Sequence, residues 1–475
     1  MTDTRIRTIA VVGNGVAAWS AAAALKKRIP DVAVAVVPVA VFRPGFVDLV
    51  GAAAPSIGNF HRDLGLDETD VVVRTGGSFR LGTRFTGWTG DGSGYIHAYG
   101  PAGQAIERVP FAPLWVRDGG SDAPFDAFSP GAVLARAGRF VPAGGLMPGG
   151  YAHGLHLDAG TYARFLESYA RHLGVAVTAA PFADANLAAD NIVSLRLRDG
   201  GELVADLYVD ATNADGVLIS ALDQSWQDWA QWLPCSHAVR HRILAEGVLP
   251  PMDEVATLPD GWCATAELPA FRETLRIQVG QTADQGSGGL RFCSGRRPQA
   301  WIGNVVAIGE AHTVLEPLEA APLHILHTQI DRLVTSLPDR AFAAVELAHY
   351  NRVTGEEADR VRDFVILHYA TSNRPEPFWR AVRETPPPPL LAHTLALFRE
   401  RGRLPVRDGE SFDRDSWHAV LLGQGVVPRR TDVLAQRVDP ARARAAMTAF
   451  RTQLAAAAAA APLHRDYLAK LGNRA

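Results

Sequence analysis

The sequence predicts an α/β fold with a Rossmann-type dinucleotide-binding domain, a second interleaved sheet and a mainly helical C-terminal part. An apolar strand, Ile9 to Val12, runs into a glycine turn and then into an alanine-rich helix. Strand-like segments recur until about residue 308, and the chain is mostly helical from Arg340 onward. We therefore expect one domain over residues 1–335 and a helical part over residues 336–475.

The glycine turn Gly13-Asn14-Gly15-Val16-Ala17-Ala18 has the spacing of a dinucleotide-binding fingerprint. Gly13 permits the tight turn, Gly15 lets the backbone approach a pyrophosphate, and the small Ala18 lets helix and strand pack closely. A glycine-rich turn without a nucleotide is the alternative. The position between a strand and a helix favours nucleotide binding.

The second half of this fingerprint is missing. The strand Val32 to Val37 should end in an Asp or Glu that binds the adenosine ribose, but the chain continues Pro38-Val39. Ribose recognition must use other groups, or the dinucleotide is held loosely, or the site no longer binds it.

Composition excludes several classes of function. The net charge of -3 leaves no basic surplus for nucleic acid, and 47% hydrophobic with 20% charged residues is ordinary for a globular protein. The three cysteines have no ligand spacing, so we expect neither a disulfide framework nor a metal site. Without a signal-peptide core or an apolar run of ~18 residues, a cytoplasmic protein with no membrane partner is expected.

Local patterns predict the remaining elements in order. We expect helices over 56–64, 159–172 and 320–337, and strands over 78–85, 205–211, 261–279 and 301–308. The Gly-, Ala- and Pro-rich segment from Gly119 to Gly150 is expected to wind over the surface. Pro386 to Pro389 predicts an extended connector, and the alanine run Ala455 to Ala461 prolongs a C-terminal helix until Pro462.

With these residues in place, the chain resembles the flavin-dependent tryptophan halogenases over nearly its whole length. The landmarks that agree in order are Trp19, His156-Leu157-Asp158, Ala205 to Asp210, Gly295-Arg296, Ala300-Trp301, Asn304, Leu315-Glu316-Pro317-Leu318-Glu319, Arg362-Asp363-Phe364, His368-Tyr369 and Pro377-Phe378-Trp379.

The resemblance implies an FAD-binding fold of the flavin monooxygenase kind. A separate flavin reductase supplies reduced FAD, which acts with oxygen to convert halide to hypohalous acid, and this acid travels to a lysine beside the organic substrate. The resemblance further implies a small aromatic or indole-like substrate, free or part of a larger molecule. The residues expected to bind the cofactor are Gly13, Gly15, Ala18, Trp19, Gly309 and Pro317.

Arg80 stands where the family has its lysine, and Glu319, the lysine's partner in the family, is retained. A guanidinium is a much weaker acid than an ammonium and holds its protons far more tightly. We identify Arg80 and Glu319 as the catalytic candidates and expect them to form an ion pair. A purely structural pair is the equal alternative.

Other departures concern the halide and the substrate. The family follows the Leu-Glu-Pro-Leu-Glu motif with Ser-Thr-Gly, whose last two N–H groups hold chloride, whereas this chain has Ala320-Ala321-Pro322 and so lacks one donor. The family has two guard tryptophans, in a Trp-x-Trp-x-Ile-Pro segment that shields the tunnel through which the hypohalous acid travels. Only the first of them, Trp262, remains in this chain. The family's long aromatic insertion is shortened here to Glu410 through Leu422, with Phe412 and Trp417 as its only aromatics. This favours a more open pocket and a substrate other than free tryptophan, and a deletion without functional meaning is the alternative.

Three histidines near the motif could serve as acid or base, but packing is their default role: His312, His324 and His327.

Three functions stay open. The chain is a flavoenzyme that oxygenates or oxidises an aromatic substrate without halide, a halogenase with an arginine-variant site, or a non-catalytic ligand-binding member. Loss of the lysine and of a halide donor favours the first or third, and the retained Glu319 favours the first.

Overall fold

The computed structural model describes residues 4–118, 123–144, 147–245, 247–280 and 289–472. Two compact units interleave along the chain. Unit 1 comprises Met1–Gly77, Leu157–Ala230 and Leu290–Asp359, and unit 2 comprises Ser78–His156, Gln231–Gly289 and Arg360–Ala475. The division at residues 335 and 336 stays a prediction.

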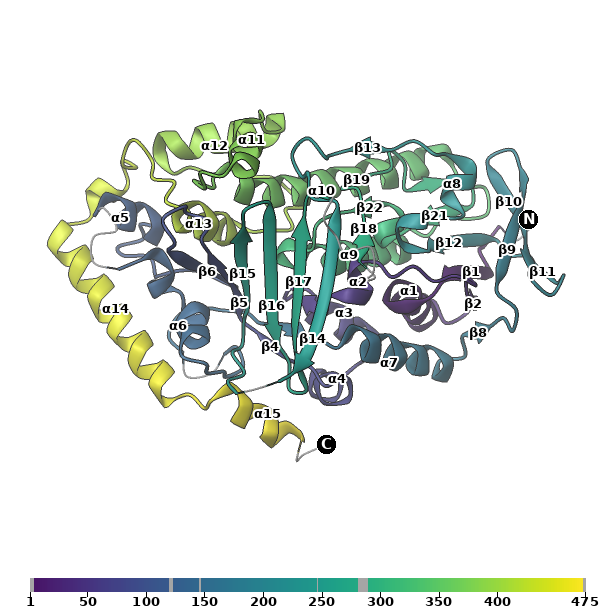
Figure 1. Ribbon diagram of the computed structural model, residues 1–475, viewed down its shortest axis with the longest axis horizontal. Coiled ribbons are helices and arrows are strands. Elements are labelled where there is room, and N and C mark those ends of the chain that lie inside the picture. Colours follow the sequence, from purple (N-terminus) through teal and green to yellow (C-terminus); the bar gives the residue numbers. More distant parts are fainter. Residues whose placement is uncertain (1–3, 119–122, 145–146, 246, 281–288, 473–475) are drawn as a thin grey trace. The chain divides into compact units, whose positions relative to one another are not determined.

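Unit 1 is built on a mainly parallel sheet with the strand order β20-β21-β12-β1-β2-β8 (Figure 1). Its strands are Trp301–Ile302, Val305–Ala307, Leu207–Ala211, Thr8–Gly13, Ala33–Val37 and Ala176–Val177. Val12 pairs in parallel with Val37 on one side and with Asp210 on the other. The carboxyl ends of β1, β2 and β12 therefore share one edge, where Rossmann-type sheets bind their ligands.

The helices of unit 1 are α1 (Gly15–Arg28), α2 (Phe46–Leu49), α3 (Ile57–Leu64), α4 (Glu68–Thr75), α7 (Ala159–His172), α8 (Ile219–Leu222) and α9 (Ala321–Thr335). One small antiparallel sheet contains β9 (Phe182–Ala188), β10 (Asn191–Leu197) and β11 (Glu202–Leu203). A second contains β13 (Gln227–Asp228), β19 (Gly295–Arg296) and β22 (Thr313–Val314). The alanines of α1, Ala21 to Ala24, are buried, and their small side chains permit close packing of the helix.

Unit 2 contains the strand order β14-β17-β16-β15-β5-β6, namely His237–Leu244, Phe271–Gln278, Gly261–Glu267, Asp253–Leu258, Gly82–Thr86 and Gly94–Ala98. A separate antiparallel pair joins β4 (Ser78–Arg80) to β7 (Gly154–His156). Its helices are α5 (Phe111–Arg117), α6 (Pro130–Arg136), α11 (Pro377–Glu384), α12 (Pro389–Arg401), α13 (Arg414–Gly423), α14 (Pro440–Ala460) and α15 (His464–Gly472). The long helix α10 (Ala344–Ala370) contributes residues to both units.

Most predicted elements agree with the structure, and three differ. The strand expected over 301–308 is two antiparallel strands, β20 and β21, in which Trp301 pairs with Val306. The strand expected over 78–85 is divided at Leu81, whose N–H donates to the Pro251 carbonyl at 2.7 Å while its carbonyl accepts from Tyr99 at 3.0 Å. The chain thus leaves β7 and joins the larger sheet. The expected surface segment Gly119 to Gly150 was wrong in part, because its described residues include α6, where Ala132 and Leu134 are fully buried. Among the described residues, no helix has the length and apolarity needed to span a membrane.

Candidate active site

The nucleotide turn requires glycine at two positions. Gly13 has φ +144°, and a Cβ there would lie 2.3 Å from the Ala211 carbonyl oxygen. Gly15 has φ +70°, and its Cβ would lie 2.2 Å from Oδ1 of Asp48. Ala18 is fully buried, so it packs inside the unit. The turn therefore has the backbone geometry that the sequence predicts for close approach of a ligand.

A pocket of about 360 Å³ opens beside this turn in unit 1. It is lined by Gly13, Asn14, Gly15, Trp19, Val36, Pro38, Phe42, Ala163, Arg164, Glu167, Arg171 and Val177. Three of the predicted cofactor-binding residues thus line one cavity, and Pro38 occupies the place of the missing ribose acid. The cavity has the size of a small-ligand subsite.

The Asp48 carboxylate caps the turn and the start of α1. It accepts the Val16 N–H at 2.8 Å, the Gly45 N–H at 3.0 Å and an amide hydrogen of Asn213 at 2.9 Å. Burial raises the pKa of Asp48, and these three donors oppose that shift. An anion at a helix N-terminus is favourable. The Asp48 carboxylate therefore accepts from the Val16 N–H, a group that would donate to a pyrophosphate in such a turn.

Glu310 follows Gly309 and is almost completely buried, at 3% exposure. Its Oε1 accepts the Val47 N–H at 3.3 Å. Burial, together with the nearby Asp48 carboxylate, raises the pKa of Glu310 to about 8. The Glu310 carboxyl is thus mainly protonated at neutral pH, which leaves a hydrogen-bond donor near Asp48.

We expect Glu310→Gln to abolish part of the pH dependence of stability. The pKa of Glu310 is about 8 in the folded protein and 4.5 ordinarily. The contribution of the protonated Glu310 carboxyl to the free energy of unfolding is therefore fully present below pH 4.5 and is lost as the pH rises through 8. The cost at pH 9 is on the order of 4 kcal/mol. Urea unfolding at pH 5 and pH 9 checks this. An equal decline in wild type and variant would contradict the assignment.

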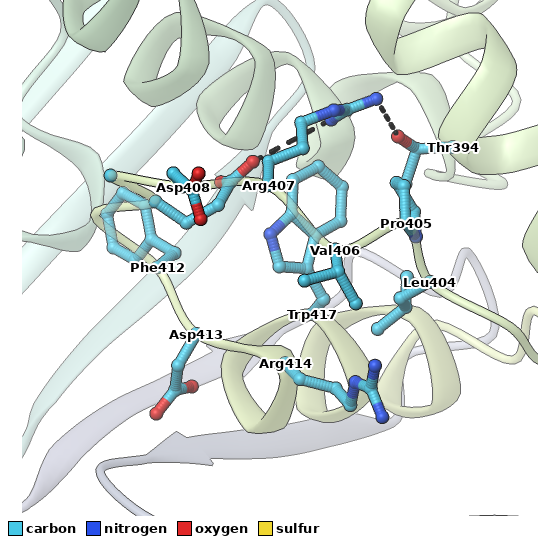
Figure 2. Close-up of a pocket in the computed structure, with 12 residues that line it drawn as sticks. Thr394, Leu404, Pro405, Val406, Arg407, Asp408, Phe412, Asp413, Arg414 and Trp417 are labelled. Atoms are coloured by element: carbon cyan, nitrogen blue, oxygen red, sulfur yellow. Dashed lines mark hydrogen bonds and ion pairs between the residues drawn. The ribbon is translucent and has the colours of Figure 1, made fainter.

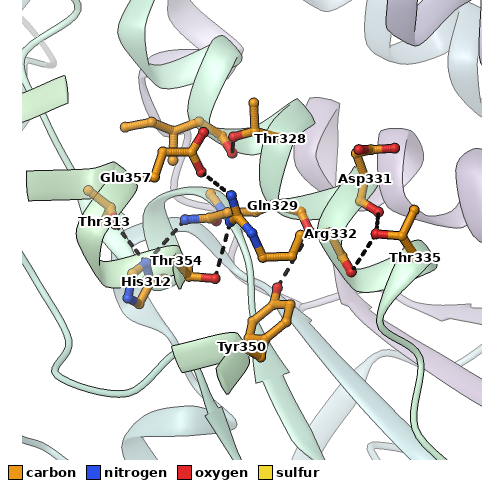
Figure 3. A network of polar contacts seen from close by, with 12 residues as sticks. His312, Thr313, Thr328, Gln329, Asp331, Arg332, Thr335, Tyr350, Thr354 and Glu357 are labelled. Carbon is orange, nitrogen blue, oxygen red and sulfur yellow. Dashed lines mark hydrogen bonds and ion pairs between the residues drawn. The ribbon is translucent and has the colours of Figure 1, made fainter. Parts of the chain in front are cut away.

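Gly309 is positioned by a polar network in unit 1, of which Figure 3 labels His312, Gln329, Arg332 and Glu357. Its N–H donates to Oε1 of Gln329 at 2.7 Å, and the Gln329 amide lies 3.1 Å from Nδ1 of His312. Burial is the main cause that lowers the pKa of His312 to about 3. Nearby, Arg332 donates to Glu357 at 2.6 Å. His312 is therefore a neutral, hydrogen-bonded part of the scaffold.

His324 and His327 are also packed. The Ser56 hydroxyl lies 3.0 Å from Nδ1 of His324, and the Phe60 ring stacks on His327 with centroids 3.8 Å apart. Burial lowers the pKa of both imidazoles. No group of three metal-ligating side chains occurs among the residues that the structure describes.

The Leu315 to Glu319 motif ends in strained backbone. Glu319 and Ala320 have φ of 57° and 59°, a region that side chains other than glycine rarely adopt. Glu319 is 3% exposed, and Pro322 lies in the first turn of α9, where an N–H would have no partner within the helix. Two adjacent residues in this conformation indicate a turn maintained for function.

Arg80 ends β4 and is completely buried in unit 2. Its Nε donates to Oδ1 of Asp253 at 2.7 Å and its Nη2 to Oδ2 at 3.3 Å, while Nη2 also donates to Thr83. The Thr83 hydroxyl donates to the same carboxylate at 3.0 Å. The buried partner of Arg80 is thus Asp253, and the ion pair with Glu319 stays a prediction.

Polar atoms without protein partners gather around Arg80. Within the described part of unit 2, Nη1 of Arg80, the hydroxyls of Ser78 and Tyr99, and both ring nitrogens of His156 are buried and make no hydrogen bond. Ser78 faces His156 across the β4–β7 pair, and the guanidinium lies 5.3 Å from the centroid of the Tyr99 ring. Such atoms require water or a ligand. The surroundings of Arg80 are therefore the candidate catalytic cluster.

The shortened aromatic segment lies elsewhere in unit 2, beside a pocket of about 420 Å³ (Figure 2). Phe412 and Trp417 line it and pack on Phe364, with centroid distances of 3.9 and 5.2 Å. Arg407 lies across it, 3.2 Å from the Thr394 hydroxyl. The guard residue Trp262 is fully buried and donates to the Tyr369 hydroxyl at 2.8 Å.

Sequence reasoning missed three carboxylates of these sites: Asp48, Asp253 and Glu310. Glu310 directly follows Gly309, so its position was a usable signal. Asp48 and Asp253 lie in segments without a motif, and only the tertiary structure brings them to Val16 and Arg80.

Comparison with known proteins agrees with this geometry. The sequence model of the family described as tryptophan halogenase matches residues 8–440. Tryptophan 6-halogenase SttH of Streptomyces toxytricini is 26% identical, with 98% of each chain covered. The solved flavin-dependent halogenase BrvH of Brevundimonas sp. BAL3 is 33% identical with a TM-score of 0.92, covering 99% of this chain and 100% of BrvH. Xcc4156 of Xanthomonas campestris, also solved as a flavin-dependent halogenase, is 30% identical with a TM-score of 0.92 and 98% coverage of both chains.

These matches confirm the predicted family and the predicted α/β fold class with its FAD-binding, Rossmann-type domain. They also imply FAD as the cofactor. The chain belongs to the flavin-dependent tryptophan halogenase family.

Proposed function

We propose that this family member uses reduced FAD and dioxygen to oxygenate an aromatic or indole-like substrate without using halide. A separate flavin reductase supplies the reduced FAD, and the protein works in the cytoplasm. One oxygen atom replaces a hydrogen of the substrate as a hydroxyl group, and the other leaves as water. The two electrons and two hydrogens come from the reduced flavin.

The observation that carries the proposal is the environment of Arg80. Its charge is neutralised by Asp253, and Nε and Nη2 are committed to Asp253 and Thr83. A guanidinium whose N–H groups are committed to a carboxylate and a hydroxyl is a poor counterpart of the family's lysine. Nη1 remains available within the described structure, and it would donate to an oxygen of the substrate.

The residues of unit 1 fit FAD. The pyrophosphate would lie at Gly13 to Val16 once the Asp48 carboxylate moves aside, and the adenosine would enter the 360 Å³ pocket. Glu310, protonated below its pKa of about 8, and the fixed Gly309 would line the flavin. Bound reduced FAD supplies the electrons for oxygen activation.

The residues expected to hold halide are altered. Pro322 has no N–H, so one of the two donors that the resemblance predicts is missing. The segment around Phe412 and Trp417, which is shorter than its counterpart in the family, supports a substrate other than free tryptophan. The missing halide donor, together with the neutralised Arg80, supports oxygenation over halogenation.

A halogenase with an arginine-variant site is the second candidate. The names of the similar proteins favour it. A non-catalytic flavin-binding member is the third candidate. It is less well supported, because buried polar atoms without partners surround Arg80.

Turnover in ¹⁸O₂ tests the proposal. With indole, reduced FAD and a flavin reductase, we expect a hydroxylated product that carries one ¹⁸O atom, measured by mass spectrometry. Arg80→Met should slow product formation, because the free Nη1 donor is lost. A product whose oxygen comes from water would contradict monooxygenation.

A further inference from the structure

The adenosine ribose lacks its usual acidic partner at the end of β2, where Pro38 stands. Glu167 of α7 is the one carboxylate among the described residues that line the pocket beside the turn. We propose that Glu167 accepts the hydroxyl groups of the adenosine ribose and takes the role of the missing acid. This inference rests on the proposed binding of FAD.

The position of Glu167 on its helix supports this role. Ala163, Arg164, Glu167 and Arg171 are spaced by one turn or less along α7, so they share one face, and all four line the pocket. The same pocket contains Gly13 and Gly15 of the turn, together with Val36 and Pro38 at the end of β2. A carboxylate on this face therefore reaches the cavity from the helix instead of from the strand.

The hydrogen bonds of Glu167 leave one oxygen available. Nε and Nη2 of Arg171 donate to Oε1 at 3.0 and 2.9 Å. Oε2 accepts no hydrogen bond from the residues that the structure describes. The Arg171 guanidinium also lies 5.8 Å from the centroid of the Trp19 ring. Both residues that Arg171 contacts, Trp19 and Glu167, therefore line the pocket. Arg171 thus orients a carboxylate whose second oxygen can accept a ribose hydroxyl.

A bare surface ion pair is the competing explanation, because Glu167 and Arg171 have the i, i+4 spacing of many exposed pairs. The chain offers a matched control. Arg352 and Glu356 form the reversed i, i+4 pair at 2.9 Å on α10, with side chains 58% and 47% exposed. Neither residue lines the pocket beside the turn. Glu356→Gln therefore removes the same kind of pair without touching this pocket.

The experiment measures the dissociation constants of FAD and ADP, by flavin fluorescence and by calorimetry, for wild type, Glu167→Gln and Glu356→Gln. ADP lacks the riboflavin part of FAD and tests the adenosine with its two phosphates. We expect Glu167→Gln to weaken both ligands about tenfold, as for the loss of one charge-assisted hydrogen bond. Glu356→Gln should change neither.

Two results would overturn the inference while FAD binding itself stands. One is equal affinity of wild type and Glu167→Gln for FAD. The other is a loss confined to FAD with ADP unaffected, because the effect would then lie outside the ribose. If wild type binds no FAD, the proposed function fails first, and the inference fails with it.

Discussion

Gly15→Leu should reduce FAD affinity by at least about a hundredfold, which makes it one of the two largest effects expected. A Cβ at Gly15 would lie 2.2 Å from Asp48 and 2.8 Å from the Phe42 ring, where the pyrophosphate must approach the backbone. Both neighbours are side-chain atoms that can move, so the fold should survive. Titration of FAD fluorescence measures the loss.

Two controls separate this effect from backbone strain. Gly76 has φ +62° and nothing within 4 Å of its Cβ position, so Gly76→Leu imposes similar strain away from the turn and should bind FAD normally. Asp48→Asn removes an anion that competes with the pyrophosphate, and it should bind FAD at least as tightly as wild type. If Gly15→Leu binds like wild type, the nucleotide site has been placed wrongly.

Asp253→Asn should destabilise unit 2 by roughly 3 to 5 kcal/mol, because it leaves the fully buried Arg80 guanidinium without a counter-charge. Arg80→Met should also destabilise, since Asp253 then loses its donors. The double variant should cost much less than the sum of the two single changes. Chemical unfolding of the four proteins gives this coupling energy.

The same cycle distinguishes the two proposed partners of Arg80. Combining Arg80→Met with Glu319→Gln tests the ion pair that the sequence predicts, and combining it with Asp253→Asn tests the pair that the structure contains. Additive effects of Arg80→Met and Asp253→Asn would show that their contact contributes nothing to stability.

Local patterns predicted the elements that depend on neighbours in sequence. The helix over 159–172 matches α7 in full, because Asp158 caps it by accepting the Thr161 N–H at 2.7 Å. The glycine turn, β1 and β2 were predicted for the same reason. The predicted boundaries of elements were wrong where a segment far away in the sequence determines them. Leu81 is an example, because its N–H donates to the Pro251 carbonyl.

The candidate sites were only half predictable. Arg80 could be found by its motif, but Asp253 is 173 residues away and reaches it through the parallel pairing of β15 with β5. A register contact of this kind leaves no local signal. The interleaving of the two units has the same origin, since three separate stretches of chain build each one. Glu167 likewise acquires its proposed role only when α7 lies beside the turn.

The most direct test of the account is turnover of indole with reduced FAD, a flavin reductase and dioxygen, in the presence and absence of bromide. Because Arg80 is neutralised by Asp253 and Pro322 lacks an N–H, we predict the same rate in both mixtures and a product that contains oxygen and no bromine. A brominated product detected by mass spectrometry would contradict the account and establish an arginine-variant halogenase. Absence of any product in both mixtures would contradict it too.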